Sequence, residues 1–350
     1  MKIMIVAKDM GGANATVPLA EVARKRGDQI VVVSEGLASV KFEAAGFPPY
    51  FKGSVNCKVE PFTVDAAAMI RSVKPNVVVC AEGSPNNLEG EFARAANAEN
   101  RYVVAVNDFW NGSTRLKARP DLVLAVDEHD GKLSQVSEPQ AKVVIAGNVG
   151  VPCRKSIEAL RNCPEVETLR SRFDQIIVYT GAGESTDAEI EALLASLAVT
   201  GGYWGLIPRF HPKHAKLDHR TGGTCEDFWV KQLSVLGGQV VYLDRVNKTD
   251  PIAVSSDVVV GTFSTLLTTA AVAGKACASL WIPAVQESLK KQAGLDEIPI
   301  VKLGCSHLIE KPTDLSTLSL SPVSEADRAK LKPFNAELAY EAISEFVGPV

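Results

Sequence analysis

Four segments of the sequence carry residues that could bind or transform a ligand, and each contains or follows a short apolar run. They are 8–14 (KDMGGAN), 180–185 (TGAGES), 208–214 (PRFHPKH) and 255–265 (SSDVVVGTFST). Glycine lets the backbone approach a ligand closely, and a helix that begins after such a turn offers free N–H groups to a phosphate. These segments therefore predict a site for a phosphorylated small molecule.

The later three segments supply the candidates for phosphate binding. His211 precedes a proline and could donate to a phosphate oxygen or protonate a leaving phosphate. Simpler interpretations stay open, because Ser264 could be only a helix N-cap, and Glu184 and Asp187 could only complement a helix dipole. The candidate phosphate-binding residues are Gly181, Gly183, His211, Ser264 and Thr265.

Histidines near 211 also raise the question of a metal. His211, His214 and His219 lie close together in the sequence, but no carboxylate or thiolate stands at a spacing typical of zinc ligands. We therefore expect no metal and no bound cofactor.

The first segment has its own simple alternative, a tight turn in which Asn14 is the helix N-cap.

Short runs rich in Val and Ile alternate with helix-like stretches along the whole chain. Such continuous apolar runs are typical of parallel strands that helices cover on both faces. The expected strands are Lys2–Ala7, Gln29–Ser34, Asn76–Cys80, Arg101–Val106, Leu122–Val126, Val143–Ala146, Ile176–Tyr179, Trp204–Pro208, Val240–Leu243, Asp257–Val260, Ala276–Leu280 and Ile300–Val301. The expected helices are Asn14–Lys25, Leu37–Ala45, Val64–Ser72, Leu88–Ala98, Ala188–Leu197, Asp227–Leu236, Thr265–Ala273 and Ala284–Gln292, with one or two more in Ser324–Val347, broken near Pro333.

This order of elements predicts an α/β protein of two Rossmann-like, doubly wound domains joined near residue 150; one large α/β domain is the alternative. We expect a first domain at 1–150, a second at 151–332, and a C-terminal helix at 333–350 that returns to the first domain. Ligands in such sheets bind at the carboxyl ends of the strands.

Composition excludes several classes of protein. The net charge is 37 − 41 = −4 and aromatic residues make up 6%, which argues against a nucleic-acid partner. The seven cysteines are odd in number and show no CxxC spacing, which favours reduced thiols in the cytoplasm. The most apolar stretch, Leu266–Val285, is interrupted by Gly274, Lys275 and Pro283, so we expect no transmembrane segment.

Three stretches together resemble the glycosyltransferase B-fold superfamily, which includes the non-hydrolysing sugar-nucleotide 2-epimerases. They are 10–36 (MGGANATVPLAEVARKRGDQIVVVSEG), 145–152 (IAGNVGVP) and 255–280 (SSDVVVGTFSTLLTTAAVAGKACASL). His211-Pro212 followed by Ser264-Thr265 is similar to bacterial sialyltransferases and related capsule or teichoic-type polymer transferases. In those enzymes these motifs bind the phosphate and nucleotide of a CMP- or CDP-linked donor.

Two departures from the resemblance bear on activity. Those sialyltransferases carry an acidic pair before a glycine as the general base, whereas Ala81-Glu82-Gly83 has a single acid. Many UDP-sugar enzymes of the superfamily carry a glutamate five residues before the glycine of the Gly-Lys turn, where this chain has Thr269. The second departure disfavours a UDP-sugar bound in the usual way and leaves a non-catalytic member conceivable.

The resemblance implies a nucleotide-sugar-dependent glycosyltransferase of cell-surface polysaccharide or glycan synthesis, with its site in an interdomain cleft. Glu82 or Asp9 would be the base and His211 the third catalytic candidate, although Glu82 could be only a capping acid. Trp110 could stack on a sugar or be a buried plug. The candidate acceptor-binding residues are Gly11, Gly12, Asn14, Asp108 and Trp110.

The partners implied are a nucleotide-sugar donor and a glycan or lipid-linked acceptor, with peripheral membrane contact open. The alternatives are a sugar-nucleotide 2-epimerase or hydrolase, and a non-catalytic ligand-binding protein of the same fold.

Overall fold

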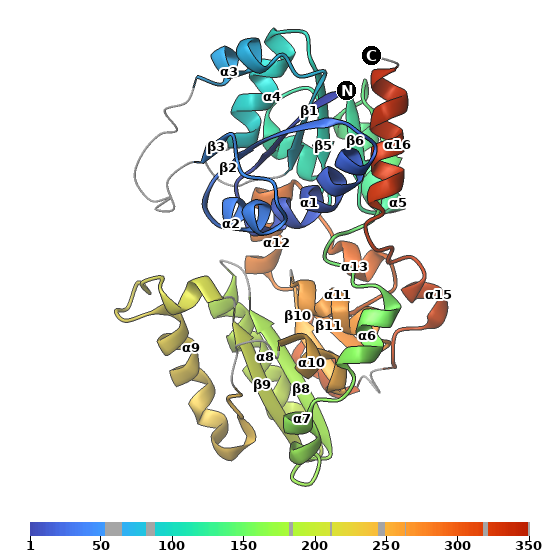
Figure 1. Cartoon of the computed structure of the whole chain (residues 1–350). Coiled ribbons are helices and arrows are strands. Elements are labelled where there is room, and N and C mark those ends of the chain that lie inside the picture. The colour runs from blue at the N-terminus through green and yellow to red at the C-terminus, as the bar shows by residue number, and fades with distance from the viewer. Residues whose placement is uncertain are drawn as a thin grey trace. The chain divides into compact units, whose positions relative to one another are not determined.

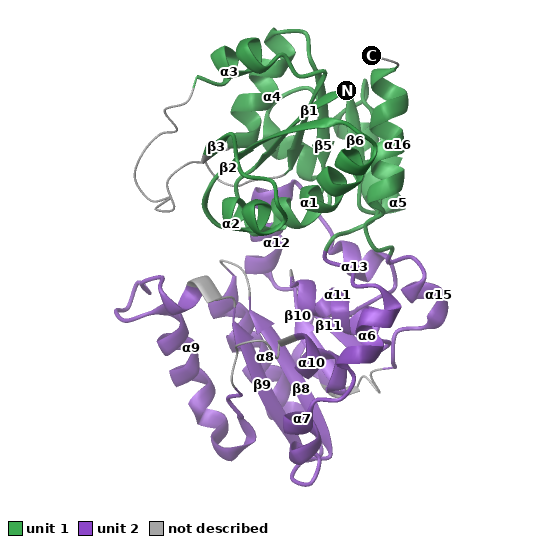
Figure 2. Ribbon diagram, viewed as in Figure 1, with its two compact units in different colours: residues 1–149, 332–350 green, residues 150–331 purple. Residues whose placement is uncertain are grey.

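A computed structural model describes residues 1–52, 65–81, 88–181, 185–210, 212–243, 249–262, 264–317 and 321–348. The chain divides into two compact units (Figure 2). Unit 1 comprises Met1–Val149 and Lys332–Val350, and unit 2 comprises Gly150–Leu331.

Unit 1 is built on a seven-stranded sheet in the order β3-β2-β1-β4-β5-β6-β7, and every paired strand is parallel. Its strands are β1 (Lys2–Ala7), β2 (Gln29–Ser34), β3 (Phe51–Lys52), β4 (Val77–Ala81), β5 (Tyr102–Val106), β6 (Leu122–Ala125) and β7 (Lys142–Ile145). Its helices are α1 (Met10–Lys25), α2 (Gly36–Ala44), α3 (Ala66–Val73), α4 (Leu88–Ala98), the 3-10 helix η1 (Gly112–Leu116), α5 (Glu128–Ser137) and α16 (Ala336–Val347).

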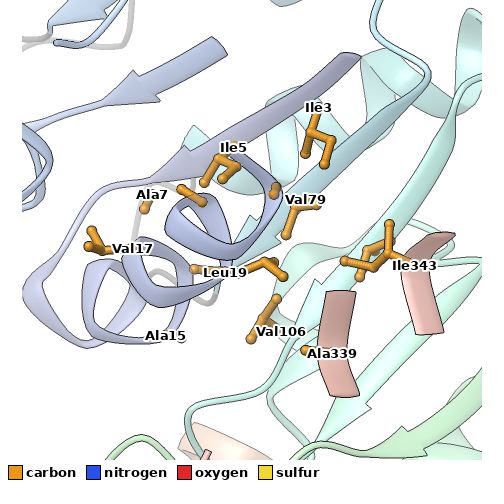
Figure 3. Close-up of a cluster of buried hydrophobic side chains, with 14 of the residues drawn as sticks. Ile3, Ile5, Ala7, Ala15, Val17, Leu19, Val79, Val106, Ala339 and Ile343 are labelled. Atoms are coloured by element: carbon orange, nitrogen blue, oxygen red, sulfur yellow. The ribbon is translucent and has the colours of Figure 1, made fainter. Parts of the chain in front are cut away.

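The strands of unit 1 bury apolar side chains on both faces of the sheet. Along β1, Ile3 and Ile5 belong to a core shared with α1 and α16, whereas Met4 and Val6 belong to a second core shared with α3 and α4. Figure 3 shows the first core, in which Ile343 of α16 lies among residues of β4, β5 and α1. This two-sided burial is the physical reason for the continuous apolar runs in the sequence.

Unit 2 has a five-stranded parallel sheet in the order β12-β11-β10-β8-β9. Its strands are β8 (Gln175–Gly181), β9 (Trp204–Phe210), β10 (Val258–Gly261), β11 (Ala276–Leu280) and β12 (His307–Ile309). Its helices are α6 (Arg154–Leu160), α7 (Pro164–Leu169), α8 (Thr186–Val199), η2 (Pro212–Ala215), α9 (Cys225–Leu233), η3 (Ser234–Gln239), α10 (Thr249–Ser255), α11 (Thr265–Val272), α12 (Pro283–Ala293), α13 (Pro299–Lys302), α14 (Pro312–Thr317) and α15 (Glu325–Arg328) (Figure 1).

Two of the expected strands are wrong. Val240–Leu243 makes only an isolated bridge between Val240 and Leu206, so the described part of this segment is not a strand. Ile300–Val301 lies inside α13, where Pro299 at the first helical position favours a helix. The two-residue strand β3 and the three-residue strand β12 were not predicted.

The chain returns to unit 1 beside the end of β7. The Asn335 N–H donates to the Ala146 carbonyl at 2.7 Å, and the Asn148 N–H donates to the Lys332 carbonyl at 2.8 Å. Gly147 has φ +93°, and a Cβ there would lie 2.2 Å from the Pro333 carbonyl oxygen. The segment that leaves unit 1 (146–148) and the segment that returns to it (332–335) therefore run side by side. Residue 147 must be a glycine where the two segments touch. Pro333 lies between α15 and α16, where a break was expected.

Candidate functional site

In unit 1, Asp9 follows the carboxyl end of β1 and is the N-cap of α1. Its Oδ1 accepts from the Gly12 N–H at 3.1 Å. The alternative in which Asn14 caps this helix is wrong, since α1 begins at Met10 and places Gly11, Gly12 and Asn14 inside its first turns. Asn14 Oδ1 instead accepts from the Lys41 ammonium of α2.

Gly11 brings the start of α1 into contact with the loop that follows β5. A Cβ at Gly11 would lie 2.3 Å from Asp108 Oδ2, so only glycine leaves room for this carboxylate. Two of the predicted acceptor residues, Gly11 and Asp108, are thus neighbours at the carboxyl ends of β1 and β5. This edge of a parallel sheet is where ligands bind.

The loop after β5 is fixed by a buried carboxylate of α5. Asp130 accepts from Asn107 Nδ2 at 2.9 Å, from the Asn111 N–H at 2.7 Å and from the Val126 N–H at 2.9 Å. Burial raises the pKa of Asp130 to about 6, although these hydrogen bonds oppose the shift. A rigid loop of this kind holds the Asp108 main chain in place.

Trp110 does not have the open face that stacking on a sugar requires. Its side chain is 7% exposed, its Nε1 donates to Asp127 Oδ2 at 2.7 Å, and its ring packs edge-on against Phe109. The prediction of a sugar-stacking role is therefore corrected, and the alternative of a buried plug describes this residue.

Glu89, on α4, is a buried acid beneath the same edge that the sequence analysis did not single out. The residue is 0% exposed, its Oε1 accepts from the Lys8 N–H at 2.6 Å, and its Oε2 has no hydrogen-bond partner among the residues described. Burial raises its pKa to about 8, and the negative charge of Asp9 adds to the shift. The sequence does contain a signal for this buried acid, because Glu89 lies on a helix face whose other members, Leu88 and Phe92, are apolar.

Two cations lie close to these acids. Lys8 Nζ is 3.8 Å from Glu35 Oε2, and the Arg115 guanidinium lies over the Phe109 ring. The pKa of Asp9 is raised because neighbouring atoms desolvate it, and the Gly12 N–H and the charges of Arg115 and Lys8 oppose the shift. Carboxylates of different proton affinity beside cations can hydrogen-bond hydroxyl groups and exchange protons with them.

In unit 2, the carboxyl ends of β8 and β10 lie side by side, with Thr180 in register with Gly261. A Cβ at Gly261 would lie 2.1 Å from Thr180 Oγ1, which is buried and has no hydrogen-bond partner in the part of the chain described. Gly181 ends β8, where a Cβ would lie 2.9 Å from Thr186 Cγ2. Gly181 and Gly261 therefore allow the ends of β8 and β10 to lie in close contact with the side chains beside them.

Ser264 and Thr265 begin α11 at this edge. Ser264 is the N-cap and its side chain accepts from the Leu266 N–H at 3.2 Å, so the capping interpretation of Ser264 describes one of its contacts. The first turn of α11 contains no acid. The partial positive charge of this helix end is therefore not offset by a first-turn carboxylate, a favourable setting for an anion.

The start of α8 differs, because Asp187 and Glu189 lie in its first turn. Glu189 is buried, accepts from Ser185 Oγ at 2.6 Å and from the Tyr179 hydroxyl at 3.2 Å, and has a pKa that burial raises. Acids in this turn compete with a phosphate for the helix N–H groups. Of the two helix starts, α11 is the better anion site.

Asp187 hydrogen-bonds to two residues of unit 2 that follow β9 in the chain. Its Oδ2 pairs with His219 Nε2 at 3.1 Å and its Oδ1 accepts from Trp229 Nε1 at 2.6 Å. His219 stacks on Phe228, and the His214 ring packs edge-on against Trp229. These two histidines are thus packed among aromatic side chains, and no group of three His, Cys, Asp or Glu in the described residues could hold a metal ion.

Three predicted site residues, Glu82, Gly183 and His211, lie outside the described residues. A cavity of about 540 Å³ in unit 2 is lined by Thr221, Gly222 and residues of α9. We place the candidate site by the strand ends, because their orphaned hydroxyl and helix start are the groups that could hold a ligand.

No described helix is long and apolar enough to cross a bilayer.

Comparisons with known proteins find similarity by structure alone. No model of a protein family and no curated protein matches the sequence. The fold is similar to UDP-GlcNAc 2-epimerase from Methanocaldococcus jannaschii (TM-score 0.63, 12% identity, 98% of both chains). It is also similar to the Neisseria meningitidis UDP-GlcNAc 2-epimerase bound to UDP-GlcNAc (TM-score 0.61, 13% identity, 98% of this chain and 99% of that one).

Another solved structure also matches nearly the whole chain. Acinetobacter baumannii MurG has a TM-score of 0.61 and 13% identity, and covers 98% of this chain and 99% of its own. The chain therefore has the glycosyltransferase B-type fold, with two Rossmann-like α/β units. The fold predicted from the sequence is confirmed.

Proposed function

We propose that this protein is an enzyme that acts on a nucleotide-linked sugar, most simply a glycosyltransferase of glycan or cell-surface polysaccharide synthesis. The observation that carries the proposal is the polar edge of unit 2. There a buried, unpartnered Thr180 hydroxyl stands beside Gly261 and the acid-free start of α11 within the described residues. The phosphate of a nucleotide needs such donors, since a leaving nucleotide is stabilised by fixed hydrogen bonds and a helix N-terminus.

In this proposal unit 2 binds the donor through Gly181, Ser264 and Thr265. His211 and Gly183 join them as candidates from the sequence alone. Thr269 is buried in α11 and offers one hydroxyl where a glutamate would offer two carboxylate oxygens. A donor with a cytidine nucleotide, for which the resemblance does not require that glutamate, is therefore favoured over a UDP-sugar.

Unit 1 would bind the hydroxyl that receives the sugar. Asp9, which is exposed at the start of α1, and Asp108, which is half-buried beside Gly11, are carboxylates suited to hold such a group. Of the two sequence candidates for the base, Asp9 is the one that lies within the described residues. Its raised pKa brings its proton affinity closer to the neutral range in which a general base works best.

Epimerisation of a sugar nucleotide is the second candidate. Several of the structurally similar proteins bear that name, and the acids near β1 include one, Glu89, whose pKa is raised to about 8. An epimerase needs groups that can remove and return a proton, and acids of unequal pKa suit that task.

Calorimetric titration with CMP, CDP and UDP tests the binding part of the proposal. We expect one nucleotide to bind, with Ser264→Ala weakening it by about 1 kcal/mol, or about fivefold, the net value of a hydrogen bond. Ser324→Ala is the matched control, because Ser324 is likewise an N-cap of unit 2, at α15. Absence of binding by all three nucleotides, or equal effects of both variants, would overturn the assignment.

Incubation with UDP-N-acetylglucosamine in the absence of any acceptor separates the two activities. Proton NMR would show a C2 epimer only if the enzyme is an epimerase. The glycosyltransferase proposal expects UDP-N-acetylglucosamine to remain unepimerised.

A further inference from the structure

A cavity of about 510 Å³ opens on unit 1 at the amino ends of β5 and β6. This is the opposite edge of the sheet from Asp9 and Asp108, which follow the carboxyl ends of β1 and β5. The five residues of β5 separate the two places by about 13 Å. Its walls are made by Asn97, Asn100, Arg101, Tyr102, Arg119 and Asp121.

The two arginines of this cavity have no partner for their guanidinium groups in the described part of the chain. Arg101 is half-buried, and its Nε is closed off from solvent without a hydrogen-bond acceptor. The contacts of Arg119 are made by its main chain. Other arginines of unit 1 are paired, as Arg26 is with Glu337 at 3.1 Å and Arg71 with Glu99 at 2.8 Å.

The backbone beneath the arginines is firmly held. Asn97 Nδ2 donates to the Arg119 carbonyl at 2.9 Å, and Asn97 Oδ1 accepts from the Arg119 N–H at 3.1 Å. Asp121 Oδ2 accepts from the Val103 N–H at 2.8 Å, and no Arg–Asp121 ion pair forms among the described residues. The cavity therefore carries one net positive charge on a fixed frame.

Two unpaired guanidiniums facing one cavity of the described structure match the chemistry of a phosphate. Each is a planar fork of N–H donors that suits phosphate oxygens in a bidentate arrangement. Arg101 Nε is itself closed off from solvent, so the donors that a phosphate oxygen can reach are the terminal guanidinium nitrogens, which are not among the buried unpartnered atoms of the described residues.

We propose that this cavity is a second ligand site, which binds a phosphate monoester through Arg101 and Arg119. The site is separate from the proposed sugar-nucleotide site. The phosphate can belong to a soluble metabolite or to the headgroup of a lipid, and both present the same dianionic group.

Calorimetric titration of the full chain with glycerol phosphate tests the soluble source. Co-sedimentation with phosphatidylcholine vesicles containing phosphatidic acid tests the lipid source. We expect binding in at least one arm, and we expect Arg101→Gln and Arg119→Gln each to weaken it roughly 10- to 100-fold, the effect of losing hydrogen bonds to a charged group. Arg101→Lys keeps the charge but not the fork, and should fall between wild type and Arg101→Gln.

Two controls make the result specific. Arg26→Gln removes the same charge from an exposed arginine of unit 1 that is paired with Glu337, and should leave binding unchanged. Ser264→Ala reports phosphate binding in unit 2. Thermal unfolding of each variant shows that it is folded. The inference is overturned if neither arm binds, if Arg26→Gln weakens binding as much as Arg101→Gln, or if only Ser264→Ala reduces it.

Discussion

Glu89 shows how one side chain can couple the stability of unit 1 to pH. Its folded pKa of about 8 lies above the ordinary value of 4.5, chiefly because the carboxyl is buried. The native state therefore holds the proton more tightly than the unfolded chain. The stabilisation is fully present below about pH 4.5 and is lost as the pH rises through about 8.

We predict that Glu89→Gln flattens this dependence. Glutamine keeps an oxygen that can accept from the Lys8 N–H, but it does not ionise. The free energy of unfolding of the wild-type protein should fall, relative to the variant, by about 1.4 kcal/mol for each pH unit within that window. Denaturant unfolding at about pH 5, 6.5 and 8 measures the difference.

The control for this prediction is Glu91→Gln, which alters a more exposed acid of α4 paired with Arg94. Its pH dependence should match that of the wild type. If Glu89→Gln also runs parallel to the wild type across that range, Glu89 is ionised at low cost and the raised pKa is refuted.

Single residues were the hardest part of the site to predict from the sequence. Gly11 and Asp108 were recognised by their place after strands, a property that topology supplies. Trp110 and Glu89 depend instead on how side chains pack: the first is turned inward onto Asp127, and the second lies under Lys8. A sequence pattern contains the type of each residue, but it does not contain the direction in which packing against neighbours turns the side chain.

At the scale of elements, long buried strands were predicted well and short ones were not. The bounds of β1, β2 and β11 agree with the expected strands to the residue. β3 and β12, with two and three residues, contain too little sequence for a pattern, and Val240 forms a bridge with a single residue of β9, Leu206. α1 starts four residues before the expected helix, because Asp9 rather than Asn14 caps it.

Close approach of neighbouring strand ends in unit 2 gives a second prediction. Gly261→Ala places a methyl group 2.1 Å from Thr180 Oγ1 and 2.8 Å from the Thr180 carbonyl oxygen, so β8 and β10 must separate. We expect a loss of about 1–3 kcal/mol in the stability of unit 2, as for other overpacked sites. Denaturant unfolding measures it.

Gly201→Ala is the matched control, since a Cβ there meets nothing within 4 Å. It should change the free energy of unfolding by less than about 0.5 kcal/mol. Equal stability of the Gly261 and Gly201 variants would show that the strand ends are not in close contact.

At the scale of the whole molecule, the last helix completes the first unit. Ile343 of α16 is 0% exposed and belongs to the core that also holds Ile5 and Leu19. We predict that Ile343→Ala lowers the stability of unit 1 by about 2–5 kcal/mol, the usual cost of such a cavity. Hydrogen exchange followed by mass spectrometry should show faster exchange in β1 and β4, with β8 and β10 unchanged.

Leu338→Ala provides the comparison on the same helix, because Leu338 is 39% exposed. Its exchange pattern should stay close to that of the wild type. Equally fast exchange in both units after Ile343→Ala would mean that the two units unfold as one cooperative body.

The side-by-side passages at 146–148 and 332–335 also set an order of events during synthesis of the chain. A ribosome that has made unit 1 as far as Val149 must translate residues 150–331 before α16 emerges, which takes about 10 to 40 s at ordinary speeds. Helices form within microseconds. The apolar surface of unit 1 that Ile343 covers in the finished fold is therefore exposed for nearly all of that time. Unit 1 is therefore completed only after unit 2 has been synthesised, and a ribosome stalled within α16 would hold a nascent chain whose apolar surface is open to chaperones.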